Sequence, residues 1–482
     1  MKLDPEICYL ALQSRDARFD GRFFTAVVTT GVYCRPVCPA PRPRRENVRF
    51  FPCAAAAEAA GFRPCMRCRP EASPGTPAWL GTSSTVSRAM RMISEGVLDE
   101  IGIDDLATRL GMGARHLRRL FEQHLGATPI AVAQSRRVHL AKKLIDETAL
   151  PISEIAFSAG FASIRRFNDS FGKIYGRPPS DFRRNQKHTP PDQNSAIQIR
   201  LAFRPPYDWH SLIRFLGPRA IPGIEFIQDD CYRRFVAFDE CAGMIEVRLA
   251  ANSNHLLLTV PLELSKGLAQ IVERVRTMFD LRADPQTIDA HLRRDPLLAA
   301  LVKAHPGLRV PGAWDGFELA ARAILGQQVS VKAATTLMGR LVKRYGEEME
   351  GAGGEGRYKF PIAERLSRAR SNDLGMPSQR AASIRKLAHA VHRGHLKLSA
   401  FMNLEEAIQK LTAIPGIGKW TAHYIAMRAL GEPDAFPSTD LGLRHALEGK
   451  LATPFSEEKL LAVAERWRPW RAYAVMHLWN SE

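Results

Sequence analysis

The chain has 482 residues, of which 45% are apolar and 24% are charged. This length exceeds what one hydrophobic core normally organises, and the composition excludes a disordered chain, so we expect several globular domains. Lys and Arg number 68 against 50 Asp and Glu, which gives a net charge of +18. A surface this basic predicts a polyanionic partner, of which nucleic acid is the commonest.

The beginning of the chain, MKLDPEICYLALQSRDARFD, holds no apolar run as long as that of a signal peptide. No stretch of about 18 apolar residues offers a membrane span. We therefore expect a soluble, cytoplasmic protein without a membrane partner. Its eight cysteines are then not expected to form disulfides.

Four of the cysteines come in two closely spaced pairs, Cys34-x3-Cys38 and Cys65-x2-Cys68. These spacings suit one zinc ion held tetrahedrally by four thiolates. The alternative is four small core residues that happen to lie close together. The other four lack such partners and are interpreted as core residues: Cys8, Cys53, Cys231 and Cys241.

Residues 1–75 resemble the amino-terminal domain of Ada-type adaptive-response proteins, through TTGVYCRP, RENVRFF and AAGFRPCMRCRPE. The resemblance implies that Cys34 is both a zinc ligand and the acceptor of a methyl group from a methylphosphotriester in DNA. Zinc keeps a thiolate deprotonated at neutral pH. Methylation removes one negative charge from the site, so affinity for the DNA backbone should rise. A purely structural zinc site is the alternative.

Residues 82–185 contain an internal repeat, flanked by the linker-like segments 73–84 and 184–195. IDDLATRLGMGARHLRRLFEQHLGATP is followed by ISEIAFSAGFASIRRFNDSFGKIYGRPP, and each copy predicts two helices around a glycine, Gly111 or Gly160. The repeat resembles the AraC-type DNA-binding domain. This resemblance implies two recognition helices in major grooves. Their expected contacts are Arg115, Arg118 and Arg119 in the first and Ser163, Arg165 and Arg166 in the second. A plain helical bundle with solvated arginines is the alternative.

Apolar residues alternate with polar ones between 196 and 260, which predicts strands, and from 265 onward helical periodicity returns. GAGGEGR at 351–357 is interpreted as a flexible loop. We therefore expect a multidomain, mainly α-helical protein. Its parts are an α+β zinc domain (1–75), an all-α double helix-turn-helix domain (82–185), a strand-rich α+β domain (196–282) and an all-α domain (283–482).

The stretch LTAIPGIGKWTAHY (411–424) predicts two helices joined by a tight turn. Gly416 and Gly418 permit a backbone that exposes successive N–H groups at a helix start, and Lys419 adds positive charge, so the turn suits a DNA phosphate. Asp440 follows in AFPSTDLGLRHAL, where a helix begins. As a side chain it is either a helix N-cap or a carboxylate that faces a reacting sugar.

Residues 200–479 resemble the AlkA-type DNA-3-methyladenine glycosylases of the helix-hairpin-helix superfamily. The matching stretches are PPYDW (205–209), RAILGQQVSV (322–331), LGMP (374–377), PGIGKWTAHY (415–424) and AERWRPWRAYAVMHLW (464–479). The resemblance implies that Asp440 is the catalytic carboxylate. It also implies a base pocket of Trp420, Tyr424 and Trp479, with Gln327 and Gln328 at the DNA. Trp467 and Trp470 are interpreted as core residues.

Some family features are absent or changed. The Schiff-base lysine of bifunctional relatives would stand at Trp420, so strand cleavage is not expected. No cysteine follows Cys241, so no iron–sulfur cluster is expected. Gln328 stands where relatives often place a leucine wedge, and Leu441 stands where a tyrosine often follows the aspartate.

The combined hypothesis is an alkylation-response protein with three activities: a zinc methyl sensor, a DNA-reading module and a monofunctional glycosylase for alkylated bases. Its expected partners are alkylated and promoter DNA and RNA polymerase. We expect a monomer associated with the nucleoid. A rival interpretation is a transcription regulator whose glycosylase-like half only binds DNA.

Overall fold

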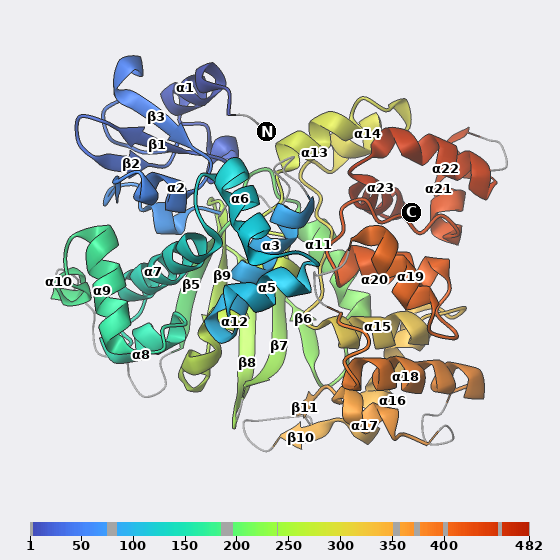
Figure 1. The fold of residues 1–482 in the computed structure, drawn as a ribbon. Helices are drawn as coiled ribbons and strands as arrows, with labels where there is room; N and C mark the ends of the chain where they lie inside the picture. Colours follow the sequence, from blue (N-terminus) through green and yellow to red (C-terminus); the bar gives the residue numbers. More distant parts are fainter. Residues whose placement is uncertain are drawn as a thin grey trace. The chain divides into compact units, whose positions relative to one another are not determined.

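The computed structural model describes residues 3–74, 84–184, 196–238, 240–349, 357–370, 376–398, 403–451 and 456–481. The chain divides into two compact units, whose helices and strands are labelled in Figure 1. The first consists of residues 1–205, 250–276 and 281–284, and the second of 206–249, 277–280 and 285–482. The segments interpreted above as linkers and as a flexible loop, and the first half of LGMP, lie almost entirely outside the described residues.

The amino-terminal segment of the first unit, residues 3–74, folds around a small sheet with the strand order β3-β1-β2-β4. Strand β1 pairs antiparallel with β2 and β3, whereas β2 pairs parallel with β4. The buried face of the sheet packs Phe24 and Tyr33 against helix α2. The elements are α1 (Pro5–Ser14), β1 (Phe24–Val27), β2 (Val32–Cys34), β3 (Val48–Phe51), α2 (Ala54–Ala59) and β4 (Arg63–Pro64).

The first unit continues with a helical region built around α7 (Pro129–Glu147). Thr128 caps this helix through a bond from the Ala131 N–H, and Pro129 takes the first helical position, where its missing N–H costs nothing. The other helices are α3 (Ser84–Ser94), α4 (Val97–Glu100), α5 (Ile103–Arg109), α6 (Ala114–Leu125), α8 (Ile152–Ser158), α9 (Ile164–Tyr175) and α10 (Pro179–Arg184).

The predicted repeat is confirmed by this arrangement. Helices α5 and α6 flank Gly111, and α8 and α9 flank Gly160, and both glycines have a positive φ. A side chain at Gly160 would also meet the carboxylate of Asp99 at 2.6 Å. The same unit ends with strands β5 (Ile197–Ala202) and β9 (His255–Val260), which pair antiparallel, and with most of α12 (Leu268–Met278).

The second unit combines an antiparallel meander with a helical body. The meander consists of β6 (Glu225–Gln228), β7 (Cys231–Phe238) and β8 (Cys241–Leu249). Its polar core is an ion pair in which Arg234 of β7 contacts Glu225 and Glu318, and Glu318 belongs to the buried helix α15.

The helices of the second unit are α11 (Trp209–Leu216), α13 (Pro285–Leu292), α14 (Pro296–Ala304), α15 (Gly316–Leu325), α16 (Val331–Tyr345), α17 (Ala363–Ser367), α18 (Ser378–His392), α19 (Leu404–Thr412), α20 (Lys419–Arg428), α21 (Leu441–Leu451), α22 (Glu457–Ala464) and α23 (Arg471–Trp479). Within the described residues, the expected helical run is interrupted by the antiparallel strands β10 (Glu347–Met349) and β11 (Arg357–Lys359). Among the described helices, none is long and apolar enough to cross a membrane.

The fold class is thus as predicted, a multidomain and mainly helical chain with an α+β start and a strand-containing part. Trp467 and Trp470 are buried, as expected. Cys8, Cys53 and Cys231 are buried too, but Cys241 is only partly buried, because it stands at the first position of β8. The prediction of a core position was therefore wrong for Cys241.

Candidate metal centre and candidate active site

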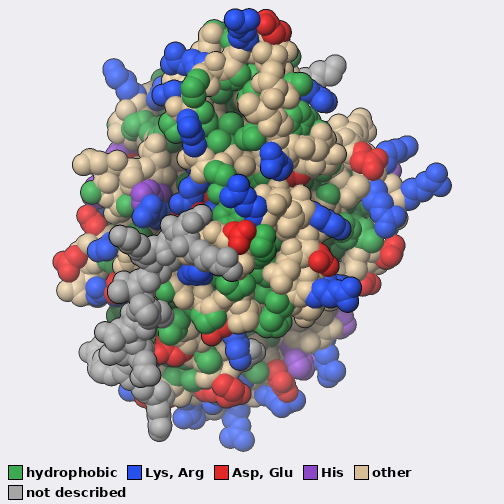
Figure 2. Space-filling view, turned by 90° about the vertical axis from the view of Figure 1, so that its left-hand side faces the viewer, with side chains coloured by type: hydrophobic (Ala, Val, Ile, Leu, Met, Phe, Trp, Pro, Cys, Tyr) green, Lys and Arg blue, Asp and Glu red, His purple; other side chains and the backbone are tan. Residues whose placement is uncertain are grey.

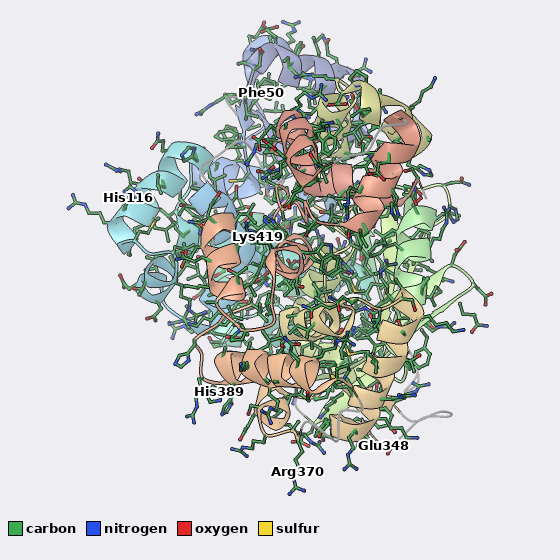
Figure 3. The ribbon with its side chains drawn as sticks, turned by 90° about the vertical axis from the view of Figure 1, so that its right-hand side faces the viewer. Phe50, His116, Glu348, Arg370, His389 and Lys419 are labelled. Atoms are coloured by element: carbon green, nitrogen blue, oxygen red, sulfur yellow. The ribbon has the colours of Figure 1, made fainter. Side chains whose placement is uncertain are left out.

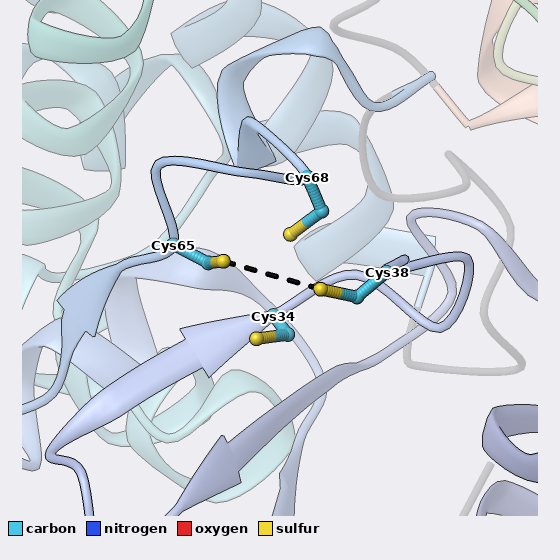
Figure 4. Close-up of side chains that lie close together, drawn as sticks. All are labelled: Cys34, Cys38, Cys65 and Cys68. Atoms are coloured by element: carbon cyan, nitrogen blue, oxygen red, sulfur yellow. Dashed lines mark hydrogen bonds between the residues drawn. The ribbon is translucent and has the colours of Figure 1, made fainter. Parts of the chain in front are cut away.

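The four paired cysteines converge in the amino-terminal segment (Figure 4). Cys34 ends strand β2, and Cys65 follows strand β4. All four ligand sulfur atoms lie within 4.8 Å of one another, and the Sγ atoms of Cys38 and Cys65 are 4.0 Å apart. The local turns therefore bring together residues that are more than 25 positions apart in the sequence.

This geometry fits one zinc ion. Zn–S bonds of about 2.3 Å in a tetrahedron place sulfur atoms about 3.8 Å apart. The Arg35 N–H donates to Cys68 Sγ at 3.3 Å, as is common for a metal-bound thiolate. The Arg35 guanidinium also binds the carboxylate of Asp20, so the backbone at the cluster is fixed from outside. The cofactor prediction of one Zn²⁺ on Cys34, Cys38, Cys65 and Cys68 is confirmed at this level.

The predicted recognition helices are α6 and α9. On α6, Arg115, Arg118 and Arg119 are exposed, while the opposite face buries Leu117 and Phe121. Figure 3 labels His116 on the same helix, whose side chains extend outward. On α9, Arg165 and Arg166 are exposed as well. Ser163 is the N-cap of α9 and accepts a hydrogen bond from the Arg166 N–H, so its hydroxyl serves the helix start.

Basic side chains also cover other parts of the surface. In Figure 2, Lys and Arg side chains are scattered over the visible face and do not gather in one patch.

The hairpin predicted in the second unit is present between α19 and α20. Gly416 has φ +94°, and a Cβ there would lie 1.8 Å from Ser383 Oγ, so only glycine fits. Gly418 is the N-cap of α20 and provides no side-chain cap, and Lys419 is exposed at the first helical position (Figure 3). The start of α20 therefore presents its N–H groups and a positive charge outward.

The two glutamines before α16 differ in their surroundings. Gln327 Nε2 donates to the Gly416 carbonyl and to Thr421 Oγ1, both at 2.9 Å, so this side chain braces the hairpin. Gln328 is exposed and has a positive φ of 56°, which is uncommon for a residue with a side chain. A role in contacting DNA stays a prediction for both residues.

Asp440 is a helix N-cap, one of the two roles that the sequence left open, and it binds two further side chains. Its Oδ1 accepts the Leu443 N–H at 3.0 Å and thereby caps helix α21. Oδ1 also accepts the Trp479 indole N–H at 2.9 Å, and Oδ2 accepts the Trp420 indole N–H at 2.7 Å. The carboxylate is therefore fixed in place by two aromatic side chains from distant elements.

The aromatic residues form a continuous wall around this carboxylate. Trp420 and Tyr424, one turn apart on α20, are stacked with ring centroids 5.2 Å apart and an interplanar angle of 9°. Trp479 stacks on Phe215 of α11 at 6.2 Å and 13°. Flat electron-rich rings beside a carboxylate can hold a planar heterocycle by stacking.

A cavity of about 330 Å³ lies against Asp440, Trp420, Tyr424 and Trp479. Two arginines that no sequence pattern identified, Arg219 and Arg322, also line this cavity. Arg219 extends across Phe215, 3.8 Å from its ring centroid. Arginines at single positions carry no periodic signal, so only the folded arrangement identifies them.

These arginines affect Tyr424. Burial acts to raise the pKa of its hydroxyl, but three neighbouring guanidinium groups outweigh that effect and lower the pKa from its ordinary value. They belong to Arg428, Arg219 and Arg322. The Arg428 guanidinium donates to the Tyr424 hydroxyl at 2.8 Å. The pocket therefore carries guanidinium groups beside its aromatic rings.

His423 is the histidine next to Tyr424 on α20. Burial, together with the charges of Arg471 and Lys419, lowers the pKa of His423 to about 4, and its Nδ1 accepts the Phe436 N–H. This ring is neutral at pH 7 and is not poised as a general acid.

Family models match four consecutive parts of the chain. They are "Metal binding domain of Ada" (residues 7–71), "Helix-turn-helix domain" (106–185), "AlkA N-terminal domain" (198–315) and "HhH-GPD superfamily base excision DNA repair protein" (321–471). The first match contains the four clustered cysteines, and the last contains the hairpin and Asp440.

Known proteins match this chain over nearly its whole length or over part of it. The chain is 42% identical over 481 residues to the "Probable bifunctional transcriptional activator/DNA repair enzyme AlkA" of Mycobacterium tuberculosis, covering 99% of this chain and 96% of that protein. It is 36% identical to DNA-3-methyladenine glycosylase 2 of Escherichia coli, over 58% of this chain and 96% of that enzyme. The solved 3-methyladenine DNA-glycosylase of Archaeoglobus fulgidus matches with a TM-score of 0.52 at 25% identity, over 58% of this chain and 96% of that one. With four clustered thiols, a helix-turn-helix pair and a hairpin beside a fixed carboxylate in one polypeptide, the chain belongs to the family of bifunctional transcriptional activator/DNA repair enzymes of the AlkA type.

Proposed function

We propose that the second unit hydrolyses the N-glycosidic bond of alkylated bases in DNA, of the 3-methyladenine and 7-methylguanine type, and leaves an abasic site. The observation that carries this proposal is the carboxylate of Asp440, fixed by two indole N–H groups at the edge of an aromatic cavity. A regulator that only binds DNA would need no such arrangement.

The carboxylate and the aromatic rings of the pocket fit this reaction. The target nucleotide turns out of the duplex, which costs least for a damaged pair, and its base enters between the aromatic rings. An N3- or N7-alkylated purine already carries positive charge and leaves without a general acid, in keeping with a neutral His423. Positive charge then builds on the sugar, and Asp440 stabilises it and orients the attacking water.

The reaction ends at the abasic site. A lyase step needs an amine that forms a Schiff base with the sugar. Trp420 occupies the position of that amine, and the neighbouring Lys419 is exposed at the helix start. Lys419 and the first N–H groups of α20 instead bind a DNA phosphate.

We propose further that Cys34 takes up one methyl group from a methylphosphotriester in DNA, once per molecule. Cys34, Cys38, Cys65 and Cys68 would hold the zinc, which keeps the thiols ionised. The Cys34 sulfur attacks the methyl carbon, the S–C bond forms, the C–O bond breaks, and the phosphate leaves as a diester anion with the electron pair. No proton or further reactant is needed.

The helix-turn-helix pair adds sequence-specific binding to promoter DNA through α6 and α9. The exposed arginines on both helices support this part of the proposal. We also propose recruitment of RNA polymerase, action as a monomer, and a place in the cytoplasm at the nucleoid.

Two experiments test these activities. Wild-type protein is incubated with methylated duplex DNA, and released bases are separated by chromatography. Free 3-methyladenine with uncut strands is expected, and strand breaks before alkali treatment would contradict the monofunctional mechanism. Intact and peptide mass spectrometry after exposure to a methylphosphotriester duplex should show one added methyl group on Cys34. The buried Cys53 serves as the internal control, and protein without any added methyl group would leave a purely structural zinc site.

A further inference from the structure

A cavity of about 650 Å³ lies beside the cysteine cluster in the first unit. Cys34, Cys38 and Cys65 line it, so it is the space from which a substrate can reach the acceptor sulfur. None of the described residues that line the cavity carries a carboxylate. Four arginines line it: Arg42, Arg63, Arg67 and Arg177. All four are exposed. Such a groove is suited to an anionic backbone.

One of these arginines does not come from the cysteine segment. Arg177 follows helix α9 of the second helix-turn-helix, and Tyr175 and Phe182 from the same region line the cavity beside it. Part of the cavity wall thus belongs to the helix-turn-helix region. Neither the cysteine spacing nor the helix-turn-helix pattern assigns a role to this loop.

Buried contacts hold this wall in place. The Tyr175 hydroxyl donates to Glu71, three residues after Cys68, at 3.4 Å. The Lys142 ammonium of α7 lies 3.7 Å from Glu71 and above the rings of Tyr175 and Phe182. Because Lys142 and Glu71 are almost fully buried, the arrangement is not a loose surface contact.

A second link lies on the other side of the cluster. Tyr33, the neighbour of Cys34, donates to Glu58 at 2.8 Å, and His139 of α7 lies 2.8 Å from the same carboxylate. The loop after α9 also lies near the cysteine segment, since a Cβ built on Gly176 would stand 3.6 Å from the Arg63 guanidinium. The cysteine cluster and the loop therefore keep a defined mutual geometry.

The chemistry of methyl transfer gives the arginines a purpose. A phosphotriester is neutral, whereas the diester that leaves carries a full negative charge. Negative charge therefore builds on the phosphoryl oxygens in the transition state, and fixed cations near them stabilise the transition state more than the substrate. Diester phosphates on either side of the lesion are anionic throughout and fix the register of the backbone.

We propose that the methyl-acceptor site is a composite groove in which Arg177, from the helix-turn-helix part of the chain, holds the DNA backbone against Cys34 and stabilises the departing diester. This inference rests on the proposed methyl transfer to Cys34 and adds a residue to that reaction. It also means that the sequence-reading module takes a direct part in the chemistry of the sensor.

The test uses the full-length, zinc-loaded protein and a duplex with one methylphosphotriester. Arg177→Gln should slow single-turnover methylation of Cys34 about fivefold or more, as expected when a charge-assisted contact is lost. Arg177→Lys should recover most of the rate. Arg200→Gln is the matched control, because it removes the same charge from an exposed position of the same unit outside the groove. When log affinity for the duplex is plotted against log salt concentration, the slope should be shallower by about 1 for Arg177→Gln than for wild type.

The outcomes are distinct. If wild type gains no methyl group, the proposed methyl transfer itself fails. If wild type reacts and Arg177→Gln reacts within about twofold of it with an unchanged salt slope, the transfer stands and the composite groove is overturned. Zinc content and circular dichroism of each variant separate a lost contact from lost folding, and a slow Arg177→Gln variant with lowered zinc content would count against the proposal.

Discussion

Replacing Asp440 by asparagine is the sharpest test of the glycosylase site. Asparagine has the same shape and is itself a good N-cap, so helix α21 should keep its start. An amide has one acceptor oxygen where the carboxylate has two, and the two indole N–H groups now bind different oxygens. One indole therefore loses its acceptor, which costs about 1 kcal/mol of stability. The fold should persist.

The larger effect is on the reaction. A carboxylate about 4 Å from the developing sugar cation contributes about 4 kcal/mol at an effective dielectric constant near 20. Each 1.4 kcal/mol or so changes a rate tenfold, so losing this charge should slow base release about a thousandfold. Binding of the alkylated duplex should change little, since the stacking rings remain.

Single-turnover release of free base from a methylated duplex, with enzyme in excess, measures this step. Glu457→Gln is the control, because this exposed carboxylate binds Ser438 close to Asp440 in the chain but does not line the cavity. Glu457→Gln should excise at the wild-type rate. If Asp440→Asn releases base within about tenfold of wild type while binding the same duplex, the electrostatic role of the carboxylate is refuted.

Three further changes probe other parts of the molecule. Trp479→Phe keeps a ring but removes the N–H that binds the Asp440 carboxylate. The rate of base excision in the single-turnover assay should therefore fall about tenfold, while affinity for the duplex stays unchanged. An unchanged rate would show that this N–H is dispensable. Gly416→Ala forces a side chain into φ +94° and against Ser383 Oγ, which should lower the free energy of unfolding by about 1 to 3 kcal/mol in a urea titration and weaken DNA binding; wild-type stability would contradict the clash. Burial acts to lower the pKa of His139, but the charge of Glu58 outweighs burial and raises the pKa of His139 above 6.5. The pKa of Glu58 is lowered below 4.5 in turn. The pair therefore stabilises fully between pH 4.5 and 6.5 and loses its contribution as the pH rises through the folded-state pKa of the histidine. The stability lost in His139→Gln, followed by hydrogen exchange of α7, should shrink on raising the pH, and a loss that grows would reverse the assigned sign.

The metal site could be read almost completely from the sequence. Zinc ligands come in short local spacings, because two thiols on one turn must point at the same ion. Cys34, Cys38, Cys65 and Cys68 therefore identify their own partners. The hairpin was equally local, since glycines in a tight turn between helices mark the backbone directly.

The active site was only half predictable. Asp440 and the three aromatic residues were expected, but the indole bonds that fix the carboxylate join residues 20 and 39 positions apart. Arg219 comes from the 3-10 turn after α11, and Arg322 comes from α15. Nothing in the sequence around a single arginine tells whether it faces a cavity. Gln327 was expected at the DNA, whereas its amide binds the hairpin. Such pairings depend on how helices pack against one another, and they produce no periodic pattern in the sequence.

The buried contacts between the cysteine segment and α7 have a consequence for how the chain can be divided. A fragment that stops at residue 74 would keep Glu71 and Glu58 yet lose Lys142 and His139, the cations that face them. Two carboxylates that are largely buried in the whole chain would then lack the cations that face them. Excised sensors and transplanted chimaeras of this protein should therefore be cut after α10, with the whole first half moved as one piece.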